Sequence, residues 1–158
     1  MKKVIGIVVL LVIAGASWYV YTSGQPTRVS EPLAMPETGE VRVENVAPLF
    51  YDGLPSDYAI VDVRTKAEYE KEYTEGTINV PVAIFEDADE PCKEIISKLP
   101  TDKKIIFICP FGPRSKEMYG NLTDSEEDLG CGMKKEGVYH LWARVKYKKD
   151  RLVVQRQK

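Results

Sequence analysis

Apolar residues along the chain gather into short runs that charged and polar stretches separate. Residues 58–63 (YAIVDV) and 105–108 (IIFI) are almost continuously apolar and rich in β-branched side chains. This is the pattern of strands buried on both faces of a parallel sheet. Shorter runs at residues 41–43, 78–82 and 138–141 predict three further strands, the last of them the final strand of the domain.

Amphipathic or charged segments lie between these strands. Pro91 opens one of them, and Ile95, Ile96 and Leu99 follow at the spacing of one helix face. Strands that alternate with helices predict an α/β fold, with a parallel sheet covered by helices on both faces and a ligand site outside the carboxyl ends of the strands. The predicted helices span residues 44–51, 66–73, 91–99 and 114–122, and the predicted loops span residues 86–90 and 123–137.

The first 21 residues differ in kind from the rest. Lys2 and Lys3 give a positive start, and residues 4–21 are uncharged and mostly apolar, which predicts an export signal or a membrane anchor. Cleavage after Ala16 would release a periplasmic protein. The uncut segment, near the ~20 residues that span hydrocarbon, would anchor the chain in the inner membrane facing the periplasm. Both interpretations predict a place in the bacterial cell envelope.

Residues 22–40 contain three prolines, two glycines and no hydrophobic period, so they predict a flexible linker. One folded domain is expected over residues 41–158. The whole chain has 158 residues, with 22 basic and 24 acidic side chains. This near-neutral balance suits a single modest domain and gives no electrostatic reason to expect nucleic-acid binding.

The sequence CPFGPRS, residues 109–115, directly follows the apolar run at 105–108. Cys109 is therefore expected at the carboxyl end of a strand, before a turn and a helix that begins near Arg114 and Ser115. The free N–H groups and positive dipole end of that helix would stabilise an anionic sulfur. Arg114 adds a cation that can clamp an oxyanion. The alternative is that Cys109 is only a small apolar residue at the end of a strand.

A second polar group follows the predicted strand at 58–63. Asp62 and Arg64 fall at the end of this strand, where they would lie near the Cys109 turn. Thr65 and Glu68 have the spacing of a capping box that would begin the next helix.

These two groups resemble the signature sequences of rhodanese domains. The sequences DVR, EY and GTINVP, at residues 62–64, 68–69 and 76–81, resemble the amino-terminal signature of the family. CPFGPRS resembles its active-site loop, C-x-x-G-x-R-S. The resemblance extends over roughly residues 41–154. It implies a five-stranded parallel sheet with helices on both faces.

The chemistry that this resemblance implies is sulfur transfer. Cys109 would attack the outer sulfur of a small anionic donor such as thiosulfate, hold that sulfur as a persulfide, and pass it to cyanide, a thiol or a protein acceptor. No cofactor is expected, and the scattered cysteines and single histidine lack the spacing of a metal site. The resemblance assigns the substrate-binding loop to Phe111, Gly112, Arg114 and Ser115, and a bracing role to Asp62 and Arg64.

Two features depart from the family pattern. Pro110 and Pro113 have no N–H, so the loop loses two donors that could hold a persulfide. Ala143 and Arg144 stand where the family usually has two glycines. Arg144 would either narrow the entrance and attract an anion, or be an ordinary solvated side chain.

These departures leave a second function open, a catalytically weak rhodanese module that binds a partner or carries sulfur in an envelope complex. Phosphatase activity is not expected, because the loop from Cys109 to Arg114 has six residues, as in sulfurtransferases, and phosphatases of this fold have one more.

The other two cysteines, Cys92 and Cys131, have three interpretations. In an oxidising compartment they could form a disulfide that leaves Cys109 alone and reactive. Both could instead be free, or Cys109 could pair with either one and make the protein a redox relay.

Overall fold

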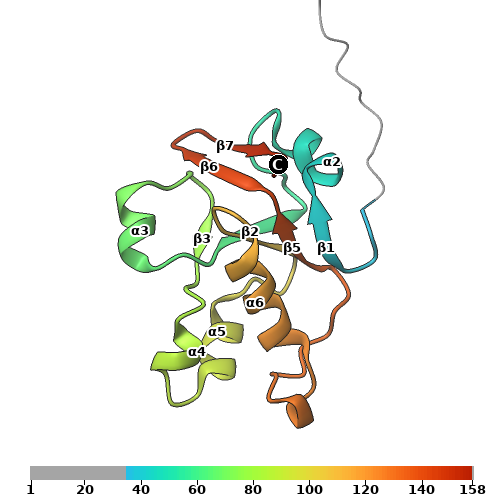
Figure 1. The fold of residues 1–158 in the computed structure, drawn as a ribbon, viewed down its shortest axis with the longest axis vertical. Coiled ribbons are helices and arrows are strands. Elements are labelled where there is room, and N and C mark those ends of the chain that lie inside the picture. Colours follow the sequence, from blue (N-terminus) through green and yellow to red (C-terminus); the bar gives the residue numbers. More distant parts are fainter. Residues whose placement is uncertain (1–34, 158) are drawn as a thin grey trace, which may run out of the picture. The chain divides into compact units, whose positions relative to one another are not determined.

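A sheet of five parallel strands forms the centre of the domain (Figure 1). The computed structural model describes residues 35–157, so the predicted signal or anchor lies outside the described residues. The strand order is β1-β5-β4-β2-β3, which places β4 in the middle, between β5 and β2. The five-stranded parallel sheet implied by the family resemblance is therefore confirmed. The strands are β1 (Gly39–Arg42), β2 (Tyr58–Asp62), β3 (Ile78–Asn79), β4 (Lys104–Ile108) and β5 (Val138–Trp142).

Helices connect these strands largely where the sequence predicts them. The predicted helix at 44–51 is divided into a short α-helix and a 3₁₀ turn, and the predicted strand at 78–82 is only two residues long. The acidic segment 86–90, predicted as a loop, begins inside a helical turn. The helices are α2 (Val43–Val46), η1 (Ala47–Phe50), α3 (Lys66–Lys71), α4 (Ile84–Asp87), α5 (Pro91–Lys98), α6 (Pro113–Thr123) and η2 (Glu126–Asp128).

The segment after β5 contains a hairpin that the sequence analysis did not predict. Strands β6 (Arg144–Lys148) and β7 (Arg151–Gln155) pair antiparallel in a separate two-stranded sheet. The prediction that residues 138–141 form the last strand was therefore wrong. The alternation of β6 is clear in the structure, with Val145 and Tyr147 buried between exposed charged residues.

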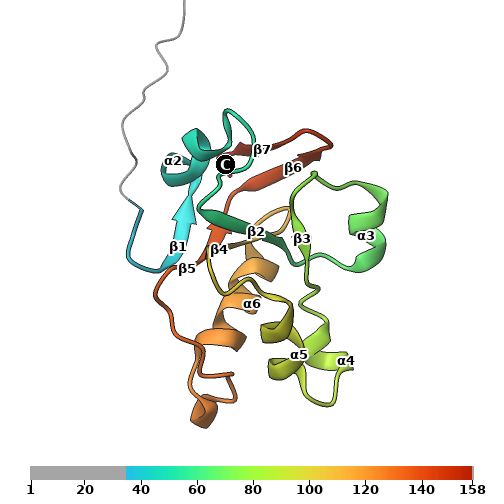
Figure 2. The same ribbon diagram turned by 180° about the vertical axis from the view of Figure 1, so that it is seen from behind.

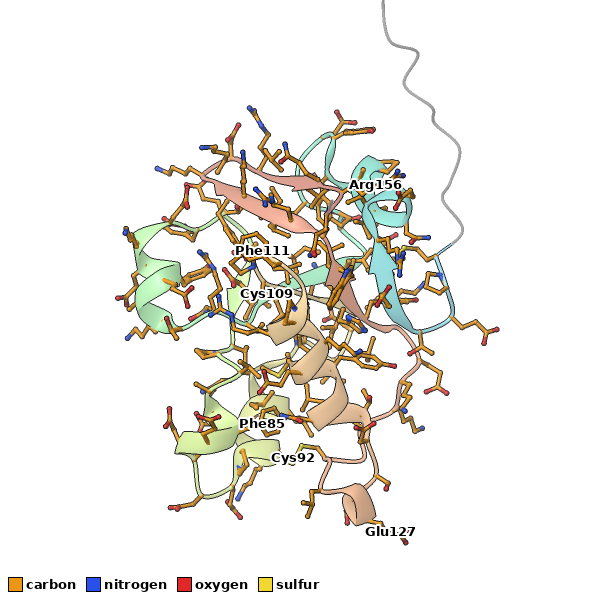
Figure 3. All side chains as sticks on the ribbon, viewed as in Figure 1. Phe85, Cys92, Cys109, Phe111, Glu127 and Arg156 are labelled. Carbon is orange, nitrogen blue, oxygen red and sulfur yellow. A yellow bond between two sulfur atoms is a disulfide. The ribbon has the colours of Figure 1, made fainter. Side chains whose placement is uncertain are left out.

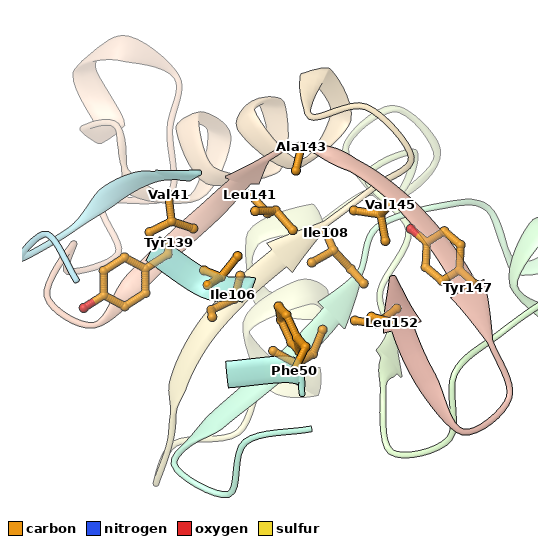
Figure 4. Close-up of a cluster of buried hydrophobic side chains, with 12 residues drawn as sticks. Val41, Phe50, Ile106, Ile108, Tyr139, Leu141, Ala143, Val145, Tyr147 and Leu152 are labelled. Carbon is orange, nitrogen blue, oxygen red and sulfur yellow. The ribbon is translucent and has the colours of Figure 1, made fainter. Parts of the chain in front are cut away.

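Different elements cover the two faces of the central sheet (Figure 2). Successive residues of a strand point to opposite faces, so Phe107 in β4 packs with Ile95 of α5 and Met118 of α6. Ile106 and Ile108 point the other way, into a cluster that includes Phe50 of η1 and the buried side of the hairpin (Figure 4). The second face is thus covered partly by a hairpin, where the sequence predicted helices alone.

A disulfide joins α5 to the segment after η2. The sulfur atoms of Cys92 and Cys131 are bonded, with their Cα atoms 5.5 Å apart, and Cys109 is the one free cysteine among residues 35–157. This is the first of the three cysteine arrangements that the sequence left open. Over the same residues, no helix combines the length and apolar character needed to cross a membrane.

Candidate active site

Cys109 lies at the carboxyl end of β4, the central strand, where the chain turns into α6 (Figure 3). Its side chain is buried, and its Sγ accepts a hydrogen bond from the backbone N–H of Gly112 at 3.0 Å. The Sγ also lies 3.7 Å from the hydroxyl oxygen of Ser115. A sulfur held by a backbone N–H at the start of a helix is placed where negative charge is stabilised.

Gly112 is required at this turn for two physical reasons. Its φ is +101°, a backbone conformation that side chains with a Cβ rarely adopt. A Cβ at this position would also lie 2.8 Å from Cε3 of Trp142, closer than non-bonded carbon atoms approach in proteins. The glycine therefore allows the loop to fold tightly against the end of β5 while it directs its N–H at the sulfur.

Ser115 connects the loop to the central sheet. Its buried hydroxyl lies within hydrogen-bond distance of two carbonyl oxygens, those of Gly112 at 2.7 Å and Leu141 at 3.0 Å. A hydroxyl has one proton to donate, and the two carbonyls are its acceptors, so toward Cys109 the hydroxyl oxygen accepts from the thiol. Ser115 thus acts mainly in fixing the loop on β5.

Arg114 pairs with a carboxylate at the edge of the site. Its two terminal nitrogens lie 2.7 and 3.0 Å from the carboxylate oxygens of Glu68, a bidentate arrangement. The hydrogen bond from Arg114 is the main reason why the pKa of Glu68 is lowered from 4.5 to about 2. Glu68 also completes the predicted capping box with Thr65. The cation expected to bind an anionic substrate therefore already has an anionic partner.

Asp62 and Arg64 form a buried ion pair beside this loop. The shortest contact is 2.7 Å, and the exposed fractions of their side chains are 0% and 6%. Arg64 also donates to the carbonyl of Glu72, and the side-chain amide of Asn79 bonds the carbonyls of both Asp62 and Arg64. Because every charged group here has a partner, the pair is a rigid brace at the carboxyl end of β2.

The carboxyl-terminal hairpin and the residues after it hold the loop from its other side. The N–H of Val145 donates to the carbonyl of Pro110 at 2.9 Å, and the side chain of Gln157 donates to the carbonyl of Phe111. Phe111 is 52% exposed at the rim, with the guanidinium of Arg144 5.3 Å from its ring centre. Arg144 thus lies beside Phe111 of the Cys109 loop.

The structure brings together the residues that the sequence assigned to the loop. Two contacts of the site residues were not predicted, one made by Arg114 and one made by Arg64. The sequence analysis assigned Glu68 only to the helix cap, and its pairing with Arg114 joins segments 46 residues apart. Tyr147 of β6, which contacts Arg64 beside the loop, was not considered at all. The alternation in residues 144–148 was the available signal for a strand carrying it.

No metal site accompanies the cysteine in the described part of the chain. Among residues 35–157, no group of three or more His, Cys, Asp or Glu side chains is arranged to hold a metal ion. The chemistry that the site residues can supply is that of the buried Cys109 thiol at the start of α6, with the Arg114–Glu68 ion pair beside it.

The fold and this site define a single α/β domain with a cysteine loop at the carboxyl edge of a parallel sheet. The family model of the rhodanese-like domain matches residues 48–142, more than half of the chain. The chain belongs to this family.

Comparisons with solved structures give more distant likenesses. A rhodanese-related protein from Thermoplasma volcanium is 17% identical, with a TM-score of 0.41, and the match covers 66% of this chain and 84% of that one. A single-domain sulfurtransferase of Saccharomyces cerevisiae is 24% identical, with a TM-score of 0.40, covering 69% and 86%.

A protein from Rhodopseudomonas palustris, described as a possible tyrosine phosphatase, is 26% identical, with a TM-score of 0.37. The match covers 56% of this chain and 63% of that one. No curated protein matches the chain. Family membership therefore rests on the sequence match to the family model.

Proposed function

We propose that this protein is a sulfurtransferase that carries sulfur as a persulfide on Cys109. One observation carries the proposal: the free thiol of a rhodanese-like domain lies at the head of α6 and accepts the Gly112 N–H at 3.0 Å. The same N–H and the helix dipole would stabilise the negative charge of a thiolate or a persulfide. The six-residue loop supports sulfur transfer over phosphate chemistry.

The reaction consists of two displacements at sulfur. The Cys109 thiolate attacks the outer sulfur of thiosulfate, so a new S–S bond forms, the S–S bond of thiosulfate breaks, and sulfite leaves with the electron pair. The acceptor, such as cyanide or a thiolate, then attacks the terminal sulfur of the persulfide. This second step releases thiocyanate or a new persulfide and restores the Cys109 thiolate. Sulfur moves between nucleophiles and no external oxidant is consumed.

The direct test is the mass of the intact protein after incubation with thiosulfate. We expect the protein to gain one sulfur atom, about 32 Da, and to lose it on addition of cyanide as thiocyanate forms. Since the other two cysteines are joined in a disulfide, Cys109→Ala should abolish both the adduct and the turnover. Ser97→Ala, on the exposed face of α5, is the matched control. An adduct that persists in Cys109→Ala would refute the assignment.

A second function, a sulfur carrier or binding module with little turnover, has one observation in its favour. Arg114 is paired with Glu68, so its cation is less available to bind thiosulfate than a free arginine. In this case the persulfide would form from a stronger donor and pass only to a protein acceptor. Loading without thiocyanate production in the same assay would favour this function.

We also propose that the domain works in the bacterial cell envelope, tethered or released by the segment at residues 4–21. The composition of that segment supports export. The Cys92–Cys131 disulfide supports an oxidising compartment such as the periplasm. Fractionation of cells that produce the full chain would test this, and recovery in the cytoplasm with three reduced cysteines would contradict it.

A further inference from the structure

Strand β6 crosses the carboxyl edge of the sheet, from the Cys109 loop toward the segment after α3. Near its start, Val145 bonds the carbonyl of Pro110 at 2.9 Å. At its other end, the carbonyl of Lys148 accepts from the hydroxyl of Thr74 at 2.8 Å. Tyr147 lies on the same buried side of β6 as Val145, two residues along. Both ends of this strand are fixed, so the place of Tyr147 beside the loop is fixed as well.

The Tyr147 ring is held at the buried ion pair that braces the site. The guanidinium carbon of Arg64 lies 3.5 Å from the centre of the ring, in the geometry of a cation–π contact. Arg64 is itself held by Asp62. The ring is only 3% exposed and belongs to the hydrophobic cluster shown in Figure 4. Its position is therefore determined by packing on one side and by a paired cation on the other.

The hydroxyl group of Tyr147 is buried and has no hydrogen-bond partner among residues 35–157. Buried hydroxyls are normally paired, because leaving one unpaired costs free energy of folding. Phenylalanine would fill the same hydrophobic space without this cost. The hydroxyl of Tyr147 is therefore a donor that a ligand bound beside the Cys109 loop could use.

We propose that the hydroxyl of Tyr147 donates a hydrogen bond to the terminal sulfur of the persulfide formed on Cys109. This inference rests on the proposed sulfurtransferase function and adds a sulfur-binding group to it. The terminal sulfur is the atom that appears when the protein is loaded and disappears when it is discharged. Its arrival would give the phenol a partner that the unloaded protein lacks.

The loop keeps the N–H groups of Phe111, Gly112, Arg114 and Ser115 but lacks two others, so a donor from outside the loop would add to its set. A persulfide in this type of loop is held by inward backbone N–H groups. Pro110 and Pro113 have no N–H group. Among the described residues, the backbone N–H that reaches Sγ in the unloaded protein is that of Gly112. The hydroxyl of Ser115 is shared with two carbonyl groups. A phenol supplied from β6 would replace part of what the prolines remove.

Electrostatics keeps the phenol in the form that can donate. Burial raises the pKa of Tyr147 above its ordinary value, and the negative charges of Asp62 and Cys109 raise it further, against the opposing effect of Arg64 and Arg114. The hydroxyl therefore keeps its proton at neutral pH. The geometry links the ring to the same end of the sheet, because it lies over Arg64, whose partner Asp62 pairs in the sheet with Ile108, one residue before Cys109.

The test is the equilibrium between loaded and unloaded protein. Thiosulfate loads Cys109 and sulfite unloads it, so the ratio of the two ions that gives half-loading, read by intact mass, measures the stability of the persulfide. For Tyr147→Phe we expect half-loading to require about a tenfold higher ratio of thiosulfate to sulfite. A change of this size corresponds to the loss of one hydrogen bond to a charged group. Its melting temperature should equal or exceed that of the wild type, because the substitution removes an unpaired polar atom.

Tyr139→Phe is the matched control. Tyr139 is equally buried, at 3%, in the same cluster, and Figure 4 shows it at the opposite end from Tyr147. It should load as the wild type does. A half-loading ratio for Tyr147→Phe within twofold of the wild type overturns the inference and leaves the proposed function standing. If the wild type forms no persulfide, both are overturned.

Discussion

Glu68 serves two structures at once, since its carboxylate caps α3 through Thr65 and binds Arg114 across the site. These contacts give it a pKa of about 2, against an ordinary value of 4.5. A carboxylate whose pKa is lower in the folded than in the unfolded protein stabilises the fold above the unfolded pKa. This stabilisation is lost as the pH falls from about 4.5 toward 2.

Replacing Glu68 by Gln tests this charge alone, because glutamine also completes a capping box. Glu68 and Arg114 are 41% and 34% exposed, so solvent screening leaves a loss of about 1 kcal/mol or less in the free energy of unfolding at pH 7. The difference from the wild type should shrink to nothing as the pH falls toward 2. Urea unfolding at several pH values measures it, with Glu70→Gln as the control. A difference that stays constant down to pH 2 would contradict the ion-pair account.

Some residues of the site can be predicted from the sequence and others cannot, depending on whether their contacts are local in the chain. Cys109 and Gly112 are visible because a strand, a turn and a helix start follow one another within a few residues. The capping role of Glu68 is visible because Thr65 is three residues away. Tyr147 could not be found because its contact with Arg64 joins residues that are far apart in the sequence, and no local pattern records such a contact.

Among the secondary-structure elements, the hairpin is the one that the hydrophobic pattern of the sequence predicts least well. Three of the five strands of the central sheet contain runs of buried residues, and these three and β1 were placed to within two residues. In β6 every second residue is charged, and in isolation the segment resembles a solvated basic tail. Its two buried residues suffice because β7 and η1 complete the cluster on which they pack. Tertiary packing, more than local sequence, thus decides this element.

Leu152 in β7 should carry much of the hairpin's stability. It is 4% exposed in the cluster that contains Phe50 and Tyr147, so Leu152→Ala should lower the free energy of unfolding by about 2 to 3 kcal/mol. Val153→Ala, at the more exposed next position, should cost less than about 1 kcal/mol. Denaturant titration measures both.

Hydrogen exchange at the Val145 N–H should also accelerate in Leu152→Ala, because that group bonds Pro110 only while the hairpin is docked. Equal stability losses in the two variants would show that the hairpin does not depend on this contact.

At the scale of the whole molecule, the disulfide and the reactive cysteine are separate systems. Cys92 and Cys131 tie α5 to the segment after η2, and Figure 3 shows Cys92 far along the domain from Cys109. The bond closes a loop with a sequence separation of 39 residues. Cross-links of this kind stabilise mainly by limiting the unfolded chain. Removing the bond should therefore affect stability and leave the geometry around Cys109 unchanged.

The double variant Cys92→Ala, Cys131→Ala tests this separation. We expect its free energy of unfolding to fall by about 2 to 4 kcal/mol, while thiosulfate still loads one sulfur per chain at a temperature where the domain remains folded. In the wild type, alkylation under denaturing conditions should label one thiol before reduction and three afterwards. Loss of loading in the folded double variant would show that the disulfide shapes the site. Labelling of three thiols before reduction would show that the bond is absent, and with it the main support for an oxidising compartment.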